Sequence, residues 1–158
     1  MNKIEIEKIV QAVVSECATQ TMHLSLAKVL IECIEERARE LGLQVVIAVG
    51  DSSGNIVAVH SMDNAYIASY DIAVNKVFTS ASLKMSTAEL GKLSQPGQAL
   101  YGIQHTNGGK IVIFGGGEVL EIDNQVIGAL GVSGGSAKQD TQLAAFGKEV
   151  LKEVIKCL

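Results

Sequence analysis

A glycine-rich segment between Lys110 and Asp140 contains the residues whose spacing most resembles a chemical motif. Ten of the 16 glycines lie in the range 102–135, and Gly131-Val132-Ser133-Gly134-Gly135 follows an apolar stretch. This G-x-S-x-G spacing is typical of the hydrolase nucleophile elbow, a strand-to-helix turn that presents a reactive serine. In that fold the acid and the histidine follow the serine, whereas all three histidines here precede Ser133. The order favours a structural role, in which small residues permit a sharp turn and Ser133 meets helix-terminal amides.

A second glycine run, Gly115-Gly116-Gly117, does not follow a phosphate-binding pattern. Glu118 and another predicted strand come after it rather than a helix, and the chain has no G-x-x-x-x-G-K-[ST]. A β-turn that requires positive φ is a sufficient explanation for these glycines. The alternative is that an exposed glycine turn beside a helix N-terminus contacts an anionic or flat ligand closely.

Lys76 lies in an otherwise apolar helical stretch, AVNKVFTSA. One interpretation is a surface lysine whose stem lies along apolar surface while its ammonium reaches water. The other is a partner for a carboxylate at the edge of a pocket.

The three histidines do not have the spacing of a metal cluster, since neither H-x-x-x-H nor H-E-x-x-H occurs. His60 and His105 are expected on the solvent side of a strand end and a loop. His23 differs because it lies in the joint between two predicted helices, where a ring nitrogen can ligate a metal or haem iron.

Composition limits the classes of protein to which the chain can belong. The 158 residues are 47% hydrophobic and 19% charged, which indicates one globular domain over residues 1–158. Aromatic residues make up 4% and tryptophan is absent, so the core must be aliphatic. A net charge of −4 with no basic block disfavours nucleic-acid binding. Mean hydropathy is +0.29, high for a monomer of this size, which favours a homo-oligomer.

The cysteines and the N-terminal sequence indicate a cytoplasmic protein. Cys17, Cys33 and Cys157 are odd in number and widely spaced, so reduced thiols are expected rather than disulfides or structural zinc. The N-terminus lacks the apolar region of a signal peptide. No stretch reaches the ~18 apolar residues of a membrane span.

Apolar periodicity and turn residues predict the order ααββα(α)βββα. Helical spacing runs from Ile6 to Cys17, Ser25 is expected to cap the next helix, and Gly42 to end it. A hairpin is expected next, with one strand from Val45 and the other over Ile56–His60. It is followed by a helix over Ala65–Leu83 and a short helix that Ser86 caps and Pro96-Gly97 ends. The rest is expected to be a loop over 98–109, strands over 110–114, 119–122 and 126–132, and a last helix that begins with a Ser136/Gln139 capping box. Short turns imply antiparallel pairing, and five strands with helices on both faces make a three-layer α/β/α sandwich of the α+β class.

Several separated motifs resemble one known family. They are VVIAVGDSSGNIVAVHSMDNA, DIAVNKVFTSAS and GGGEVLEIDNQVIGALGVSGGSAKQD, in this order. Together they resemble the GlcG/HbpS-type family, which includes the C-terminal domain of PduO-type proteins, over about residues 24–146. The segment SLKMSTAELGKLSQPGQALYGIQHTNGGKIVIFGGG is similar to the OrfY-type members encoded beside glycerol and diol dehydratase genes.

This resemblance implies a profilin-like sandwich with a five-stranded antiparallel sheet, homo-oligomers from dimers to octamers, and haem b or a related tetrapyrrole as ligand. In the PduO-type domain a histidine near the N-terminus ligates haem iron, and His23 matches it by position. His23 is therefore the expected metal ligand. Lys76, the backbone amides of Gly116 and Gly117, and Ser133 are the other expected cofactor contacts. The resemblance implies no catalytic residue.

Three functional hypotheses remain open at this point. The leading one is an oligomeric cytoplasmic accessory protein that binds haem b and serves corrinoid-dependent glycerol or propanediol metabolism. The second is an enzyme that degrades haem or transforms another small molecule, which the lack of an evident acid, base and nucleophile set weakens. The third is an interaction module for a diol or glycerol dehydratase system. None of the three involves a nucleic acid or a membrane.

Overall fold

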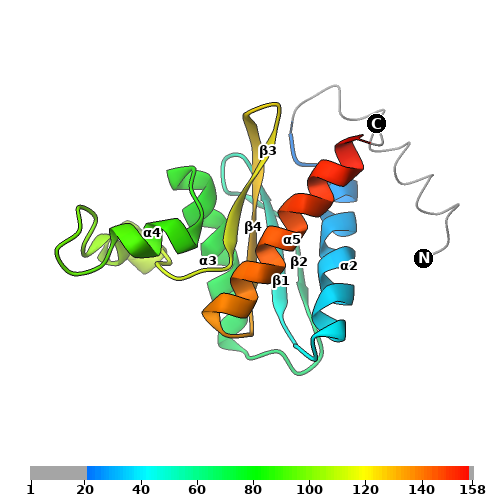
Figure 1. Ribbon diagram of the computed structural model, residues 1–158, viewed down its shortest axis with the longest axis horizontal. Helices are drawn as coiled ribbons and strands as arrows, with labels where there is room; N and C mark the ends of the chain where they lie inside the picture. Colours follow the sequence, from blue (N-terminus) through cyan, green and yellow to red (C-terminus); the bar gives the residue numbers. More distant parts are fainter. Residues whose placement is uncertain (1–20, 157–158) are drawn as a thin grey trace, which may run out of the picture.

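A computed structural model describes residues 21–156, so the predicted helix between Ile6 and Cys17 lies outside the described residues. Within this range the elements are α2 (Leu24–Glu40), β1 (Val46–Asp51), β2 (Ile56–Ser61), α3 (Ala68–Leu83), α4 (Thr87–Leu93), the short 3-10 helices η1 (Ile103–His105) and η2 (Asn107–Gly109), β3 (Gly117–Ile122), β4 (Gln125–Ser133) and α5 (Ala137–Lys156). Figure 1 shows their arrangement around a single sheet.

The sheet is antiparallel, with strand order β2-β1-β4-β3. Val46 at the start of β1 pairs with Ser61 on β2 and with Ser133 on β4. Strands β1 and β4 therefore form the centre of the sheet, and the end of β4 lies beside the start of β1.

The predicted strand over 110–114 is wrong, and the sheet has four strands rather than five. Ile111 and Val112 are buried, as their apolar character suggests, but this segment lies along α3 instead of a strand. The hydroxyl of Thr79 on α3 accepts the Val112 N–H at 3.0 Å and donates to the Asn75 carbonyl of its own helix at 2.7 Å, with the Lys110 carbonyl oxygen 3.3 Å away. One side chain thus takes the hydrogen-bonding place of a neighbouring strand.

Helices cover both faces of the sheet with different side chains. Alternation along β1 points Ile47 and Val49 into one cluster with α2 and α5, which lie side by side in Figure 1. Val46 and Ala48 belong to a second cluster with α3. We call these the aliphatic side and the α3 side.

Local signals in the sequence are mostly confirmed, and the starts of two helices are not. The Asp51 carboxylate accepts the N–H groups of Ser53 and Asn55, which closes the predicted hairpin. The predicted Ser86 cap accepts the N–H of Glu89 at 3.1 Å. However, α2 begins at Leu24 with His23 at the N-cap, so Ser25 is inside the helix rather than its cap.

The third helix begins at Ala68 rather than at Ala65, and residues 65–67 lie outside it. Ile67, directly before the helix, is 97% exposed. Across residues 21–156 the structure contains no helix with the length and apolar character of a membrane span.

Candidate functional site

His23 lies at the N-terminus of α2, where it is half-buried and next to Leu24, which is 57% exposed. The preceding residue anchors this joint to the sheet, since the Met22 N–H donates to the Ile127 carbonyl at 3.1 Å. Further along the same helix a hollow of about 150 Å³ is lined by Ser25, Lys28, Val29 and Glu32. The α2 N-terminus therefore offers an imidazole, apolar surface and a cation near one another.

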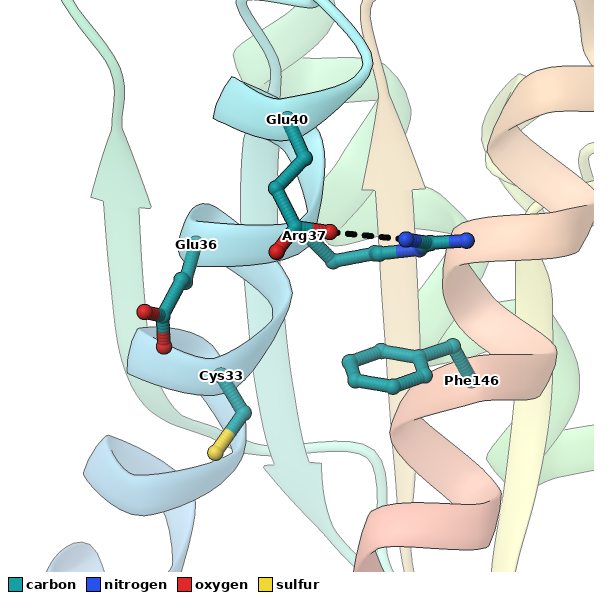
Figure 2. Close-up of a pocket in the computed structure, with 5 residues that line it drawn as sticks. All are labelled: Cys33, Glu36, Arg37, Glu40 and Phe146. Carbon is teal, nitrogen blue, oxygen red and sulfur yellow. Dashed lines mark hydrogen bonds and ion pairs between the residues drawn. The ribbon is translucent and has the colours of Figure 1, made fainter.

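A larger hollow of about 310 Å³ lies between the later turns of α2 and α5 (Figure 2). Its lining includes Cys33, Phe146 and the ion pair between Arg37 Nη1 and Glu40 Oε2 at 2.7 Å. Burial raises the pKa of the Cys33 thiol, and the charges of Glu36 and Glu32 raise it further. A thiol that stays protonated is a poor nucleophile and a poor metal ligand, which agrees with its being a free cysteine.

The other two histidines do not join His23. His60 Nδ1 lies 2.9 Å from Glu35 Oε1 at the surface, and His105 is exposed in η1. The His60 side chain is 39% exposed. Among residues 21–156, no group of three or more His, Cys, Asp or Glu side chains is arranged to hold a metal ion.

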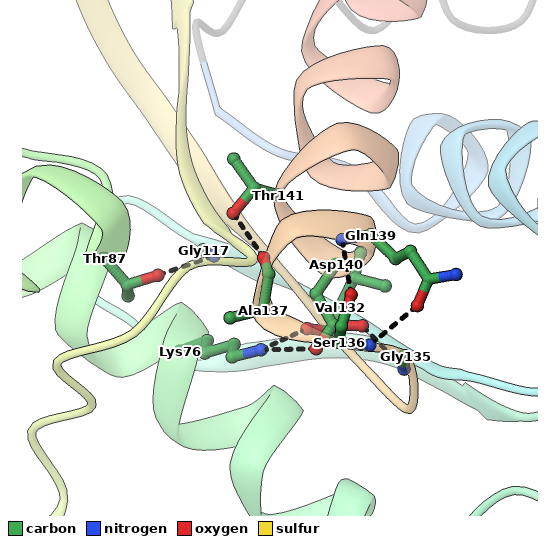
Figure 3. A network of polar contacts seen from close by, with 10 residues as sticks. All are labelled: Lys76, Thr87, Gly117, Val132, Gly135, Ser136, Ala137, Gln139, Asp140 and Thr141. Carbon is green, nitrogen blue, oxygen red and sulfur yellow. Dashed lines mark hydrogen bonds and ion pairs between the residues drawn. The ribbon is translucent and has the colours of Figure 1, made fainter.

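Lys76 occupies the centre of a buried polar cluster on the α3 side (Figure 3). Its side chain is 0% exposed, so the surface-lysine interpretation is wrong. The ammonium donates to the Val132 carbonyl at 2.6 Å and to Asp140 Oδ2 at 3.0 Å. The carboxylate partner considered from the sequence thus comes from the protein itself, on α5.

Burial dominates the electrostatics of this ion pair. Loss of water lowers the pKa of Lys76, and the charge and hydrogen bond of Asp140 oppose this change only in part. The Phe114 ring, whose centroid lies 5.1 Å from the ammonium nitrogen, adds a cation–π contact. The ammonium is therefore fully surrounded by groups of its own chain.

The glycines of the two sequence motifs make room for this cluster. A Cβ on Gly116, where φ is +116°, would lie 2.6 Å from Lys76 Nζ and 2.6 Å from the Val132 carbonyl oxygen. A Cβ on Gly131 would overlap the Ala73 carbonyl oxygen of α3. The Gly117 N–H donates to Thr87 Oγ1 at 2.8 Å. Gly116, Gly117 and Gly131 permit close packing rather than forming an exposed turn.

Asp140 is the important residue that sequence reasoning missed. Its Oδ1 accepts the Gly135 N–H at 2.8 Å while its Oδ2 holds Lys76, so it joins the end of β4 to α3. The predicted capping box beside it is confirmed, because Gln139 Oε1 accepts the Ser136 N–H at 2.9 Å and Ser136 Oγ accepts the Gln139 N–H at 3.3 Å. From the sequence alone, an acidic residue in the first turn of a helix predicts only a favourable interaction with the helix dipole.

A hollow of about 270 Å³ opens beside the cluster, between the start of α3 and the start of α5. Tyr66, Ser69 and Ile72 form one wall, and Phe114 and Ser133 are on the others. Ser133 is 5% exposed and Ser69 is 3% exposed. Of the expected cofactor contacts, Ser133 is the one that lines this hollow.

The expected site residues therefore fall into two groups. Lys76, Gly116, Gly117 and Ser133 lie together at the end of β4. His23 lies near the start of the same strand, because its neighbour Met22 is hydrogen-bonded to Ile127. Ile127 and Ser133 are six residues apart, which is ~20 Å along the strand at ~3.3 Å per residue. Within one chain, these are two separate locations.

Comparison with known proteins gives a consistent assignment. Residues 22–149 match the family model described as haem degrading protein HbpS-like. The chain is 42% identical to the Klebsiella pneumoniae protein OrfY, whose crystal structure superposes with a TM-score of 0.82 over 85% of this chain and 92% of that one. It is 36% identical to PduOC in a crystal structure with haem, with a TM-score of 0.79 over 82% of this chain and 94% of that one.

A curated relative is much longer than the region that matches. The chain is 41% identical over 109 residues to the corrinoid adenosyltransferase PduO of Salmonella typhimurium, an alignment that covers 69% of this chain and 32% of PduO. The chain thus spans about a third of that relative's length.

Proposed function

The chain belongs to the HbpS-like family, and on this basis we propose that it binds haem b or a related tetrapyrrole with His23 as the axial ligand of the iron. Membership in this family confirms the resemblance seen in the sequence motifs. The observation that supports haem most directly is the likeness to PduOC, which was crystallised with haem and aligns with 82% of this chain.

The residues at the α2 N-terminus fit such a ligand. His23 supplies an imidazole, the ligand that iron prefers in many haem proteins. Leu24 and Val29 supply apolar surface for the macrocycle, and the exposed ammonium of Lys28 suits a propionate. Bound haem would supply the redox and ligand-binding chemistry of iron at this position.

Lys76 has no part in holding the haem in this proposal. Its ammonium is buried and already bound to Asp140 and to the Val132 carbonyl. Gly116, Gly117 and Ser133 lie in the same separate location, so His23 and its neighbours on α2 carry the proposed site.

A second chain completes the site in our proposal. The hollow of about 150 Å³ on α2 is smaller than the ~300–1,000 Å³ of pockets that enclose a drug-sized ligand, so one chain covers only part of a macrocycle. A homo-oligomer also accounts for the large apolar side chains that a monomer would expose. These include Ile67 at 97%, Tyr66 at 74% and Tyr101 at 65%. Similarity to PduO supports a role as an accessory protein of corrinoid-dependent metabolism.

Titration of the purified protein with hemin tests this proposal. We expect a saturable shift of the Soret band, and we expect His23→Ala to abolish it because the iron loses its protein ligand. His105→Ala is the matched control, since His105 is exposed and distant in the fold, and it should bind as the wild type does. An identical spectrum for His23→Ala would exclude His23 as the ligand, and no shift in the wild type would exclude haem binding. Light scattering that gave 16.6 kDa would exclude the oligomer.

Haem degradation is a second candidate, and the description of the matching family favours it. Haem-loaded protein incubated with a reductant or peroxide would lose its Soret band and release a product if the protein degrades haem. Haem that stays intact and gives no product would exclude haem degradation and support haem binding alone.

A further inference from the structure

Two serines, each largely buried, line the hollow between α3 and α5. Ser69 is 3% exposed and Ser133 is 5% exposed. Within residues 21–156, no side-chain or backbone group forms a hydrogen bond with either hydroxyl. Neither oxygen is among the enclosed side-chain atoms that lack a partner in this range, so both hydroxyls are accessible from the hollow. Two hydroxyls that the protein leaves without a partner are available to hydrogen-bond a molecule that enters the hollow.

The hollow has the size and walls of a small-molecule site. Its volume of about 270 Å³ is roughly nine times the ~30 Å³ that one water occupies in the liquid. Ser69 comes from the first turn of α3 and Ser133 is the last residue of β4, so rigid elements position both hydroxyls. Tyr66, Ile72 and Phe114 supply apolar surface around them. A few polar groups among apolar walls are typical of ligand sites.

Charges in and beside this hollow are already compensated. Asp140 lines it, but its two carboxylate oxygens accept the Gly135 N–H and the Lys76 ammonium. The next amide, that of Ser136, is bound by Gln139. The positive groups that would attract an anion at the start of α5 are therefore occupied by the protein's own carboxylate and amide oxygens. An uncharged ligand fits this arrangement, because it needs no counter-charge.

We propose that the hollow between α3 and α5 binds a small uncharged molecule that carries hydroxyl or carbonyl oxygens, which Ser69 and Ser133 hydrogen-bond while Tyr66 and Phe114 flank its carbon skeleton. This site is separate from the proposed haem site, since it lies at the opposite end of β4 from the α2 joint. It does not depend on haem binding, and either site can exist without the other.

Glycerol and glycerate form a matched pair of probes, because they differ in one group, CH₂OH against carboxylate. In ¹⁵N-labelled full-length protein, we expect glycerol to give saturable shifts of the Gly134 and Gly135 amides, which border the hollow, and glycerate to give none. Ser69→Ala and Ser133→Ala should each raise the midpoint concentration of glycerol about fivefold, as the loss of one hydrogen bond predicts.

Matched serines elsewhere provide the controls. Ser82 is exposed on α3, the helix that carries Ser69. Ser61 is exposed on β2 and pairs with Val46, whose partner on the other side is Ser133. Ser82→Ala and Ser61→Ala should leave the glycerol midpoint unchanged. All four variants should keep the wild-type melting temperature, because no protein hydrogen bond is lost. Stronger binding of glycerate, no saturable shift with glycerol, or a wild-type glycerol midpoint in the Ser69→Ala and Ser133→Ala variants would each overturn the proposal.

Discussion

The two sides of the sheet stabilise the protein in different ways. On the aliphatic side, long side chains such as Leu30, Ile34 and Leu130 fill the space between the sheet, α2 and α5. On the α3 side, the apolar cluster consists of alanines and valines, and buried polar residues accompany it. These are Ser69, Lys76, Thr79, Ser80 and Thr87.

This difference separates nondirectional from directional packing. Burial of aliphatic surface contributes in proportion to area and tolerates exchange between similar shapes. A buried polar group needs a partner at a defined distance and angle, and its loss leaves that partner unsatisfied. The α3 side therefore fixes the positions of individual atoms, which is what a binding site requires.

Lys76→Met should have the largest effect on stability. The substitution leaves the Asp140 carboxylate, whose side chain is 4% exposed, without its ammonium partner. Breaking a buried pair in this way costs about 3–5 kcal/mol, and we expect about 4 kcal/mol here. The free energy of unfolding from urea denaturation measures it.

The double variant Lys76→Met/Asp140→Asn is the control, since asparagine keeps an acceptor for the Gly135 N–H but carries no charge. It should recover about half of the loss or more, and a loss as large as in the single variant would refute the ion-pair explanation.

The pKa of Lys76 is lowered from 10.5, so between the lowered value and 10.5 the unfolded chain holds a proton that the folded protein has released. Wild-type stability should therefore rise relative to the double variant as pH increases toward 10.5.

The origin of this ion pair shows where sequence reasoning stops. Capping boxes, the hairpin and most helix boundaries depend on neighbours in the chain, and their residues predicted them. Lys76 and Asp140 are 64 positions apart, and only the packed fold brings them together. Ser69 gave no signal either, because a serine within a helical stretch does not reveal that its hydroxyl faces a hollow.

The segment Ile111–Ile113 shows the same limit for the fold. Apolar character correctly predicted burial, but it does not distinguish a strand partner from a helix side chain. Here the hydroxyl of Thr79, rather than a neighbouring strand, accepts the Val112 N–H. By contrast, the motif of Ser133 was enough to choose it as a site residue. The motif is typical of a nucleophile, whereas in the structure Ser133 lines the hollow between α3 and α5.

Leu30→Ala is the corresponding test on the aliphatic side. Leu30 is fully buried between α2 and the sheet, so removing three carbons should cost about 3 kcal/mol through lost transfer energy and a residual cavity. Leu24→Ala on the same helix, where Leu24 is 57% exposed, should change stability by less than about 0.5 kcal/mol. The alkaline rise in stability should persist in Leu30→Ala, because Lys76 keeps its surroundings. Its disappearance would show that the two sides are not independent.

Ser80→Ala should have the smallest effect and the opposite sign. Ser80 Oγ is buried without a hydrogen-bond partner in the described structure, so its removal should stabilise the protein by at most about 1 kcal/mol. The adjacent Thr79→Val is the matched comparison, because Thr79 Oγ1 donates to the Asn75 carbonyl and accepts the Val112 N–H. Its loss should cost about 1–3 kcal/mol by leaving that N–H unsatisfied. Thermal denaturation measures the change in stability of both variants. If the two changes had the same sign, the presence of a hydrogen-bond partner would not determine the effect of a hydroxyl on the α3 side.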